Sequence, residues 1–277
     1  MPEWLDKLLG RKPAREEPPQ AASGALQVAL DQAESMALPA VALSARMAMP
    51  VPNEPVSSLG GAPSLPDGMD WPVGSNGKKM VFIAQINYAD MPVLSGYPER
   101  GLLSVFVEDE DVFGCGFPSR DQSGFRTLFF DDPSGFQRQT PPEGDIYSPF
   151  GPRLMKEGAP LTGTLTTGLP TPTCFEVDAV PTDFDIPSQD RFYDSLADRK
   201  PGALYYGGYP DFVQYDIRKP RDEPALTKVI LQLGFAHADD REWMVCWGDA
   251  GEATFLMSAG DLENRRFEQA VFSWDCG

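Results

Sequence analysis

The chain has 277 residues, 42% hydrophobic and 23% charged, which is enough apolar material for one large domain or two small ones. Its formal net charge of −18 argues against binding to nucleic acid or to an anionic membrane, and favours either plain solubility or a basic partner. The 28 prolines and 26 glycines favour many turns and short strands over long helices.

Residues 1–24 combine charge with proline and predict a flexible N-terminal tail, followed by a single domain over residues 25–277. Apolar spacing predicts a helix over residues 25–36, and the proline-bounded residues 39–51 predict an edge strand. Further strands are predicted, in chain order, over residues 80–87, 102–107, 125–130, 161–165 and 174–177.

A second helix is predicted over residues 188–200, with Ser188 as its N-cap. The C-terminal part returns to strands, with a helical turn near Asp261 between the last two. These strands are predicted over residues 229–235, 243–247, 252–257 and 267–274.

Two segments of the chain share one spacing. The stretch LGGAP contains Gly61, and YGGYP contains Gly208; Gln85 follows the first and Gln232 the second by the same 24 residues. The copies are offset by 147 residues, and by 150 further on. The repeat predicts an α+β fold with a duplicated, largely antiparallel sheet and a few short helices. Its two similar halves, about 57–130 and 204–277, would be related by a pseudo-twofold axis.

Gln85 and Gln232 each stand in the middle of an apolar strand, so both carboxamides should be buried. A buried carboxamide needs hydrogen-bond partners, or it costs about 1–3 kcal/mol. Two interpretations remain open. Each glutamine could anchor the glycine-containing loop of its own half, or the pair could line a ligand pocket where the halves meet.

Several of these motifs together resemble the YwqG-like family of bacterial proteins, a domain of unknown function. They are SSLGGAPSLPDGMDWP, MVFIAQIN, GLLSVF, YYGGYPDFVQYDI, VILQLGF and WGDAGEATFLMSAGDLENRRFEQAVFSWDC. The resemblance runs from about Ser57 to the C-terminus. It implies an α+β fold with large antiparallel sheets in a duplicated arrangement, and no particular reaction. It also carries an associational hint of bacterial toxin–immunity loci.

No catalytic residue, metal site or cofactor is predicted. The four cysteines, Cys115, Cys174, Cys246 and Cys276, form no C-x-x-C pair, and we expect free thiols in a reducing compartment. If residues 229–235 and 242–247 form a hairpin, Cys246 lies too far from His237, the only histidine, for a nucleophile pair. The chain shows neither a signal peptide nor a membrane span, so we expect a cytoplasmic protein.

Two further groups are candidate binding residues. Asp249, in the stretch WGDAGE, is either a turn residue or, with Trp247 and the two glutamines, part of a ligand-binding site. The consecutive acids Glu108, Asp109, Glu110 and Asp111 form either a solvated loop or a surface that binds a partner. In the second case they would share one acidic face with Asp131–Asp132 and Asp239–Asp240.

These observations predict a non-catalytic binding or interaction protein, for instance an immunity-type protein that neutralises a basic protein partner. The alternative is an enzyme or small-ligand receptor with a pocket between the two halves. The oligomeric state is left open.

Overall fold

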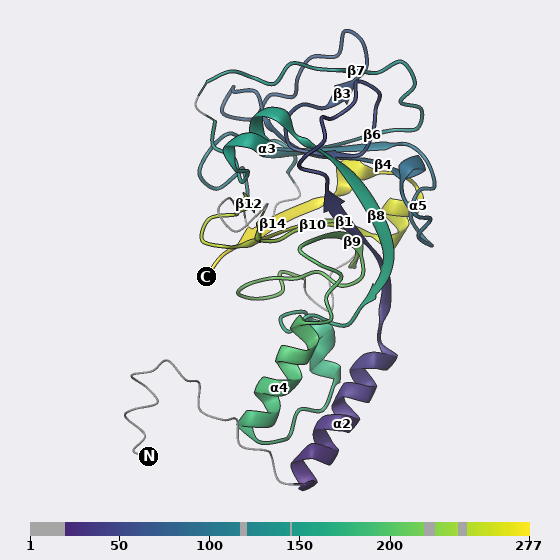
Figure 1. Cartoon of the computed structure of the whole chain (residues 1–277), viewed down its shortest axis with the longest axis vertical. Helices are drawn as coiled ribbons and strands as arrows, with labels where there is room; N and C mark the ends of the chain where they lie inside the picture. Colours follow the sequence, from purple (N-terminus) through teal and green to yellow (C-terminus); the bar gives the residue numbers. More distant parts are fainter. Residues whose placement is uncertain (1–19, 117–120, 145, 219–224, 238–242) are drawn as a thin grey trace.

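A large antiparallel sheet dominates the computed structural model, which describes residues 20–116, 121–144, 146–218, 225–237 and 243–277 (Figure 1). Most of the predicted N-terminal tail lies outside the described residues. Helix α2 (Gln20–Ser35) begins five residues earlier than the sequence predicts. Its last residue, Ser35, lies one position before the predicted end.

The sheet has ten strands, and its order places a central pair between two flanks of four strands. The central pair is β1 (Leu38–Ala45) and β8 (Ala159–Gly168). The first flank, counted outward from β8, comprises β2 (Ser58–Leu59), β4 (Val81–Asn87), β5 (Leu102–Val107) and β6 (Phe125–Phe130). The second flank, counted outward from β1, comprises β9 (Leu204–Gly207), β10 (Leu226–Leu233), β13 (Glu252–Ser258) and β14 (Val271–Asp275).

The sheet is nearly closed, because the side chains of its two outermost strands meet. The rings of Phe125 on β6 and Phe272 on β14 lie 5.6 Å apart, and the Thr127 hydroxyl donates to the carbonyl oxygen of Phe267. The main apolar core takes buried residues from both flanks, among them Val105 and Phe255. The fold is thus a mostly antiparallel, nearly closed sheet with few short helices, which is consistent with the predicted α+β class.

Strand β1 corrects the predicted edge strand. It pairs with β8 on one side and with β9 on the other, so it lies in the middle of the sheet. The prolines that suggested an edge bound the strand instead: Pro39 is its second residue, and Pro50 lies beyond its end. Its neighbours are more than 100 residues away in the chain, so no local pattern could reveal them.

The remaining elements are short. Two small sheets pair β3 (Ser64–Leu65) with β7 (Gln137–Arg138) and β11 (Ala236–His237) with β12 (Trp243–Val245). The other helices are α3 (Pro152–Glu157), α4 (Ile186–Ala197), α5 (Ala259–Glu263) and the 3-10 helices η1 (Tyr88–Asp90), η2 (Phe175–Ala179) and η3 (Phe267–Gln269).

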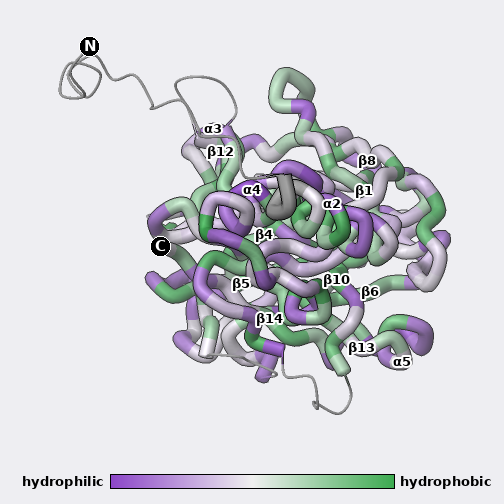
Figure 2. The backbone as a smooth tube through the Cα atoms, turned by 90° about the horizontal axis from the view of Figure 1, so that it is seen from below, coloured by the Kyte–Doolittle hydropathy of each residue, from purple (hydrophilic) through white to green (hydrophobic). Residues whose placement is uncertain are grey.

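Helices α2 and α4 form a separate small layer beside the sheet. They lie next to each other in both views and enclose their own apolar cluster, which includes Ala33, Phe192 and Leu196 (Figures 1 and 2). Among the described residues, no helix combines the length and apolarity needed to cross a bilayer.

Three local predictions are wrong. Residues 174–177 do not form a strand, because η2 occupies Phe175–Ala179. The N-cap of α4 is Asp185, whose carboxylate accepts from the backbone N–H of Ser188 at 2.8 Å; Pro187 fits the first helical turn. The strand predicted over residues 267–274 begins only at Val271, because η3 occupies Phe267–Gln269.

Candidate functional site

Gln85 lies on β4 and is almost fully buried. Its carboxamide oxygen accepts from the backbone N–H of Ser64 at 2.9 Å, and its N–H groups donate to the Ser64 carbonyl oxygen at 2.7 Å and to the Ser104 hydroxyl at 2.9 Å. Both backbone groups of Ser64 are therefore satisfied by one side chain. This is the anchoring arrangement: Gln85 fixes the segment that follows Gly60 and Gly61.

Gln232 on β10 makes the corresponding bonds to the residue that stands 21 positions earlier. Its oxygen accepts from the backbone N–H of Asp211 at 3.3 Å, and its amide donates to the Asp211 carbonyl oxygen at 2.9 Å. The Thr254 hydroxyl donates to the same carboxamide oxygen at 2.8 Å. Unlike Gln85, Gln232 also contacts a charge, because its amide donates to the carboxylate of Glu252 at 3.0 Å.

Glu252 belongs to a partly buried ionic cluster beside Gln232. The Lys200 ammonium lies 2.8 Å from the Asp211 carboxylate and 3.2 Å from that of Glu252. Glu252 packs closely over Gly234, where an added Cβ would stand 2.3 Å from its carboxylate oxygen. Burial, and then the nearby Asp211 carboxylate, raise the pKa of Glu252 to about 7, although Lys200 and Gln232 act in the opposite direction.

The raised pKa of Glu252 predicts a pH-dependent stability. Between pH 4.5, the ordinary pKa of this group, and about pH 7, the native chain holds a proton that the unfolded chain releases. The contribution of Glu252 to stability is therefore present at low pH and is lost as the pH rises through 7. Relative to Glu252→Gln, the wild type should lose about 1–3 kcal/mol between pH 5 and pH 8. Urea unfolding at both pH values measures this difference, and parallel profiles for the two proteins would contradict it.

A second buried cluster surrounds Arg218. Its guanidinium donates to the carboxylates of Glu176 and Asp216, and it lies 4.4 Å from the centre of the Phe175 ring. The Arg218 side chain is 3% exposed, and that of Asp216 is 6% exposed. The cluster fixes η2 against the chain that precedes β10.

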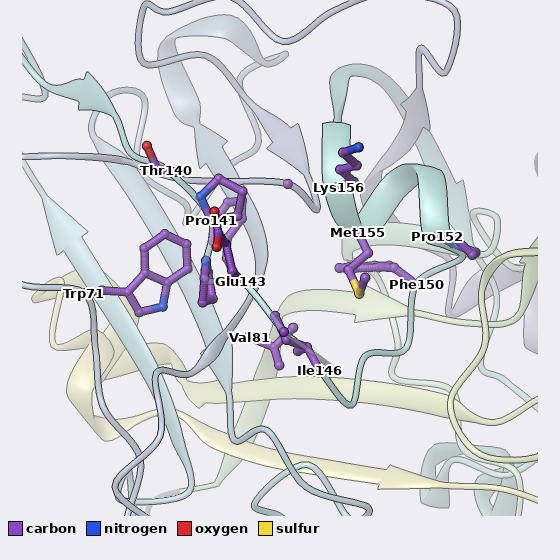
Figure 3. A pocket seen from close by; sticks show the side chains of 14 residues that line it. Trp71, Val81, Thr140, Pro141, Glu143, Ile146, Phe150, Pro152, Met155 and Lys156 are labelled. Carbon is purple, nitrogen blue, oxygen red and sulfur yellow. The ribbon is translucent and has the colours of Figure 1, made fainter.

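A pocket of about 520 Å³ lies between β4 and α3 (Figure 3). Trp71, Pro141 and Glu143 lie on one side of it, and Phe150, Met155 and Lys156 on the other. The full lining is mostly apolar, with three polar side chains. It comprises Gly61, Trp71, Val81, Phe82, Thr140, Pro141, Pro142, Glu143, Gly144, Ile146, Phe150, Pro152, Met155 and Lys156.

Both walls of this pocket are fixed by specific contacts. The Trp71 indole N–H donates to the Met80 carbonyl oxygen at 2.7 Å, which holds the ring against β4. On the other side, α3 approaches Gly60 so closely that an added Cβ there would stand 2.5 Å from the Leu154 oxygen. Gly60 also has a φ of 63°, so its replacement is disfavoured twice.

The wall formed by α3 is also hydrogen-bonded to the segment around β12. The backbone N–H of Gly151 donates to the Met244 carbonyl oxygen at 3.2 Å, and that of Cys246 donates to the Pro149 oxygen at 2.7 Å. The pocket therefore has one wall on β4 and an opposite wall that is held by β12. Because contacts fix both walls, the pocket is largely preformed. Its volume of about 520 Å³ lies in the range of small-molecule sites.

The structure separates the predicted ligand residues. Trp247 is fully buried among Phe113, Phe272 and Trp274, and its indole N–H has no hydrogen-bond partner among the described residues. Asp249 is exposed in the turn between Trp247 and β13. Neither residue lines the pocket between β4 and α3, and neither do the two glutamines.

The acidic run at 108–111 is not a solvated loop throughout. Glu108 is buried and accepts from the Ser75 hydroxyl and the Asn76 N–H, and Asp109 is buried beside Lys78. Glu110 is half-buried and accepts from the Gly114 N–H, and Asp111 is exposed.

The predicted common acidic face receives little support from the other groups. Asp131 pairs with Arg265, and Asp239–Asp240 lie outside the described residues. The part of the acid run that could reach a basic partner is therefore reduced to Glu110 and Asp111.

His237 and the cysteines show no catalytic arrangement in the described part of the chain. His237 lies opposite Trp243 in the β11–β12 pair, and the Cys246 thiol lies 3.4 Å from the Gly248 carbonyl oxygen. All four cysteines are free, and burial raises the pKa of Cys115 to about 11 and that of Cys174 to about 12. Among the described residues, no three His, Cys, Asp or Glu side chains are grouped to hold a metal ion.

Sequence reasoning missed both the ionic cluster and the pocket. One signal for the cluster was available: position 64 plus the offset of 147 is position 211, so Asp211 stands where the first copy has Ser64. At the later offset of 150, Glu252 stands opposite Leu102. The pocket gave no comparable signal, because its walls come from three segments without a shared motif.

The fold places the chain among proteins built on a large, nearly closed antiparallel sheet with a few short helices. Within this class, residues 57–276 match the family model DUF1963, a domain of unknown function, and the chain belongs to that family. The match begins at Ser57, as does the resemblance to the YwqG-like proteins, and DUF1963 is consistent with that name. No curated protein matches the chain.

Proposed function

We propose that the protein is a non-catalytic binding protein whose pocket between β4 and α3 receives a small ligand with an apolar body. The observation that carries this proposal is the pocket itself: about 520 Å³, walled by Trp71, Phe150 and Met155, with polar groups at Thr140, Glu143 and Lys156. A few polar groups around an apolar concavity are typical of small-molecule sites.

Binding is a better account of this pocket than catalysis. The carboxylate with the strongly raised pKa, Glu252, belongs to the cluster with Lys200 and Asp211, and none of these three lines the pocket. The charged groups that do line it, Glu143 and Lys156, are both exposed. An exposed charge is suited to orienting a ligand, whereas general acid–base chemistry favours a desolvated group.

We propose a small ligand for this protein in place of a basic protein partner. Two of the four acids that were predicted to bind such a partner, Glu108 and Asp109, are used internally. A YwqG-like protein of cytoplasmic location remains our expectation for this chain.

The proposal includes a duplicated origin for the two flanks. In its support, both glutamines bond the backbone of a residue 21 positions earlier, and both strands have a register shift just before the glutamine. The glycine pairs at 60–61 and 207–208 all have positive φ. After duplication the copies diverged: position 71 is the pocket tryptophan, and position 218, at the same offset, is the buried Arg218.

Filling the pocket tests the proposal. The neutral probe N-phenyl-1-naphthylamine should bind the wild type with enhanced, blue-shifted fluorescence, because its rings are matched to an apolar concavity. Met155→Trp should weaken binding by about tenfold or more, the equivalent of roughly two buried methylene groups. Leu165→Trp, which enlarges an exposed side chain on β8, is the matched control and should leave the affinity unchanged. Equal affinity in Met155→Trp and the wild type would contradict the proposal.

A further inference from the structure

We infer that the ligand of this pocket carries an oxyanion group, which Lys79 recognises; this inference rests on the proposed function. The first observation is a second hollow, of about 400 Å³, that adjoins the pocket. The two share the residues Pro142, Glu143 and Ile146. A ligand whose apolar body lies in the pocket can therefore extend a polar group into the adjoining hollow.

The charges around the two hollows are unevenly satisfied. Asp109 lines the second hollow, but its carboxylate is already held by the Lys78 ammonium at 3.1 Å and by the backbone N–H of Tyr147 at 2.7 Å. Lys79 and Lys156 are exposed and have no carboxylate partner among the residues that the structure describes. Glu143 is the remaining described carboxylate of the two linings, which together hold three ammonium groups, those of Lys78, Lys79 and Lys156, and two carboxylates.

This local excess of positive charge is set in a chain with a net charge of −18. The surrounding field repels anions, so an anion that binds here needs these ammonium groups as local partners. Apolar walls with adjacent ammonium groups suit an amphipathic anion, namely an aromatic or alkyl body that ends in a carboxylate, sulfonate or phosphate. The same net charge disfavours an anionic membrane, so the ligand is a soluble molecule and not a lipid surface.

Two probes that share one fluorophore separate the contribution of an anionic group to binding from that of the apolar body. 8-Anilinonaphthalene-1-sulfonate carries the sulfonate that N-phenyl-1-naphthylamine lacks. In Lys79→Glu, the affinity for the sulfonate probe should fall by about fivefold, as expected for one reversed charge at an exposed site. The affinity for the neutral probe should stay within about twofold. Arg100→Glu, the control, has the same change in net charge at another hollow and should affect neither probe.

The outcomes distinguish this inference from the proposed function. If Met155→Trp weakens the neutral probe but the lysine variant leaves the sulfonate probe unchanged, the pocket stands and the anion inference is overturned. If the control variant weakens the sulfonate probe as much as the lysine variant, the effect is that of net charge alone, and the inference is also overturned. Sedimentation of the wild type with phosphatidylglycerol vesicles should leave the protein in the supernatant. Co-sedimentation that depends on Lys79 would overturn the assignment to a soluble ligand.

Discussion

Arg218→Met should lower the free energy of unfolding by about 3–5 kcal/mol, because it leaves the carboxylates of Glu176 and Asp216 without their buried counter-charge. The guanidinium also donates to the Leu226 carbonyl oxygen and packs on Phe175, and both contacts are lost as well. Urea unfolding monitored by circular dichroism measures the change.

Two variants give this prediction its controls. Arg153→Met removes an ion pair whose side chains are 48% and 63% exposed, and it should cost less than about 1 kcal/mol. The triple variant Arg218→Met/Glu176→Gln/Asp216→Asn removes all three charges and should recover part of the lost stability. If Arg218→Met were as stable as Arg153→Met, the buried cluster would not hold η2 as described.

Gln85→Ala and Gln232→Ala should each lower the free energy of unfolding by about 1–3 kcal/mol. Gln85→Ala leaves the buried backbone N–H and C=O of Ser64 unpaired. Gln232→Ala leaves the backbone N–H of Asp211 unpaired, and the Asp211 carbonyl oxygen keeps only the Thr254 hydroxyl at 3.2 Å. The two glutamines lie in different flanks and share no partner, so the effects should add in the double variant.

The exposed Gln137 on β7 provides the matched control for both glutamines, and Gln137→Ala should change stability by less than about 0.5 kcal/mol. Denaturant midpoints at a constant unfolding slope give the comparison. A loss for either core glutamine no larger than that for Gln137 would show that water replaces the carboxamide, and the anchoring account would then be wrong.

Local pattern in the sequence was sufficient for the strands that pair with their chain neighbours. β5 and β6 occupy the predicted residues, because an apolar run bounded by turns determines both their position and their length. The burial of the two glutamines follows from the same reasoning. In β4 and β10, the strands that carry the two glutamines, the strict alternation of side chains between the two faces nevertheless fails. A register shift separates Phe82 from Ala84, and another separates Val229 from Leu231.

Features built from distant segments could not be predicted in this way. β1 is central because β8 and β9, both far along the chain, pair with it. Glu108 and Asp109 are buried because Ser75 and Lys78, about 30 residues earlier, satisfy them. The pocket needs Trp71, the residues around Pro142 and α3 in one place, and only the folded sheet brings them together.

The most direct test of the central claim is a crystal structure of the protein grown with N-phenyl-1-naphthylamine. The account predicts density for the naphthalene rings between Trp71 and Met155, in the pocket bounded by β4 and α3. Density for the probe elsewhere on the molecule, with this pocket filled only by water, would contradict it.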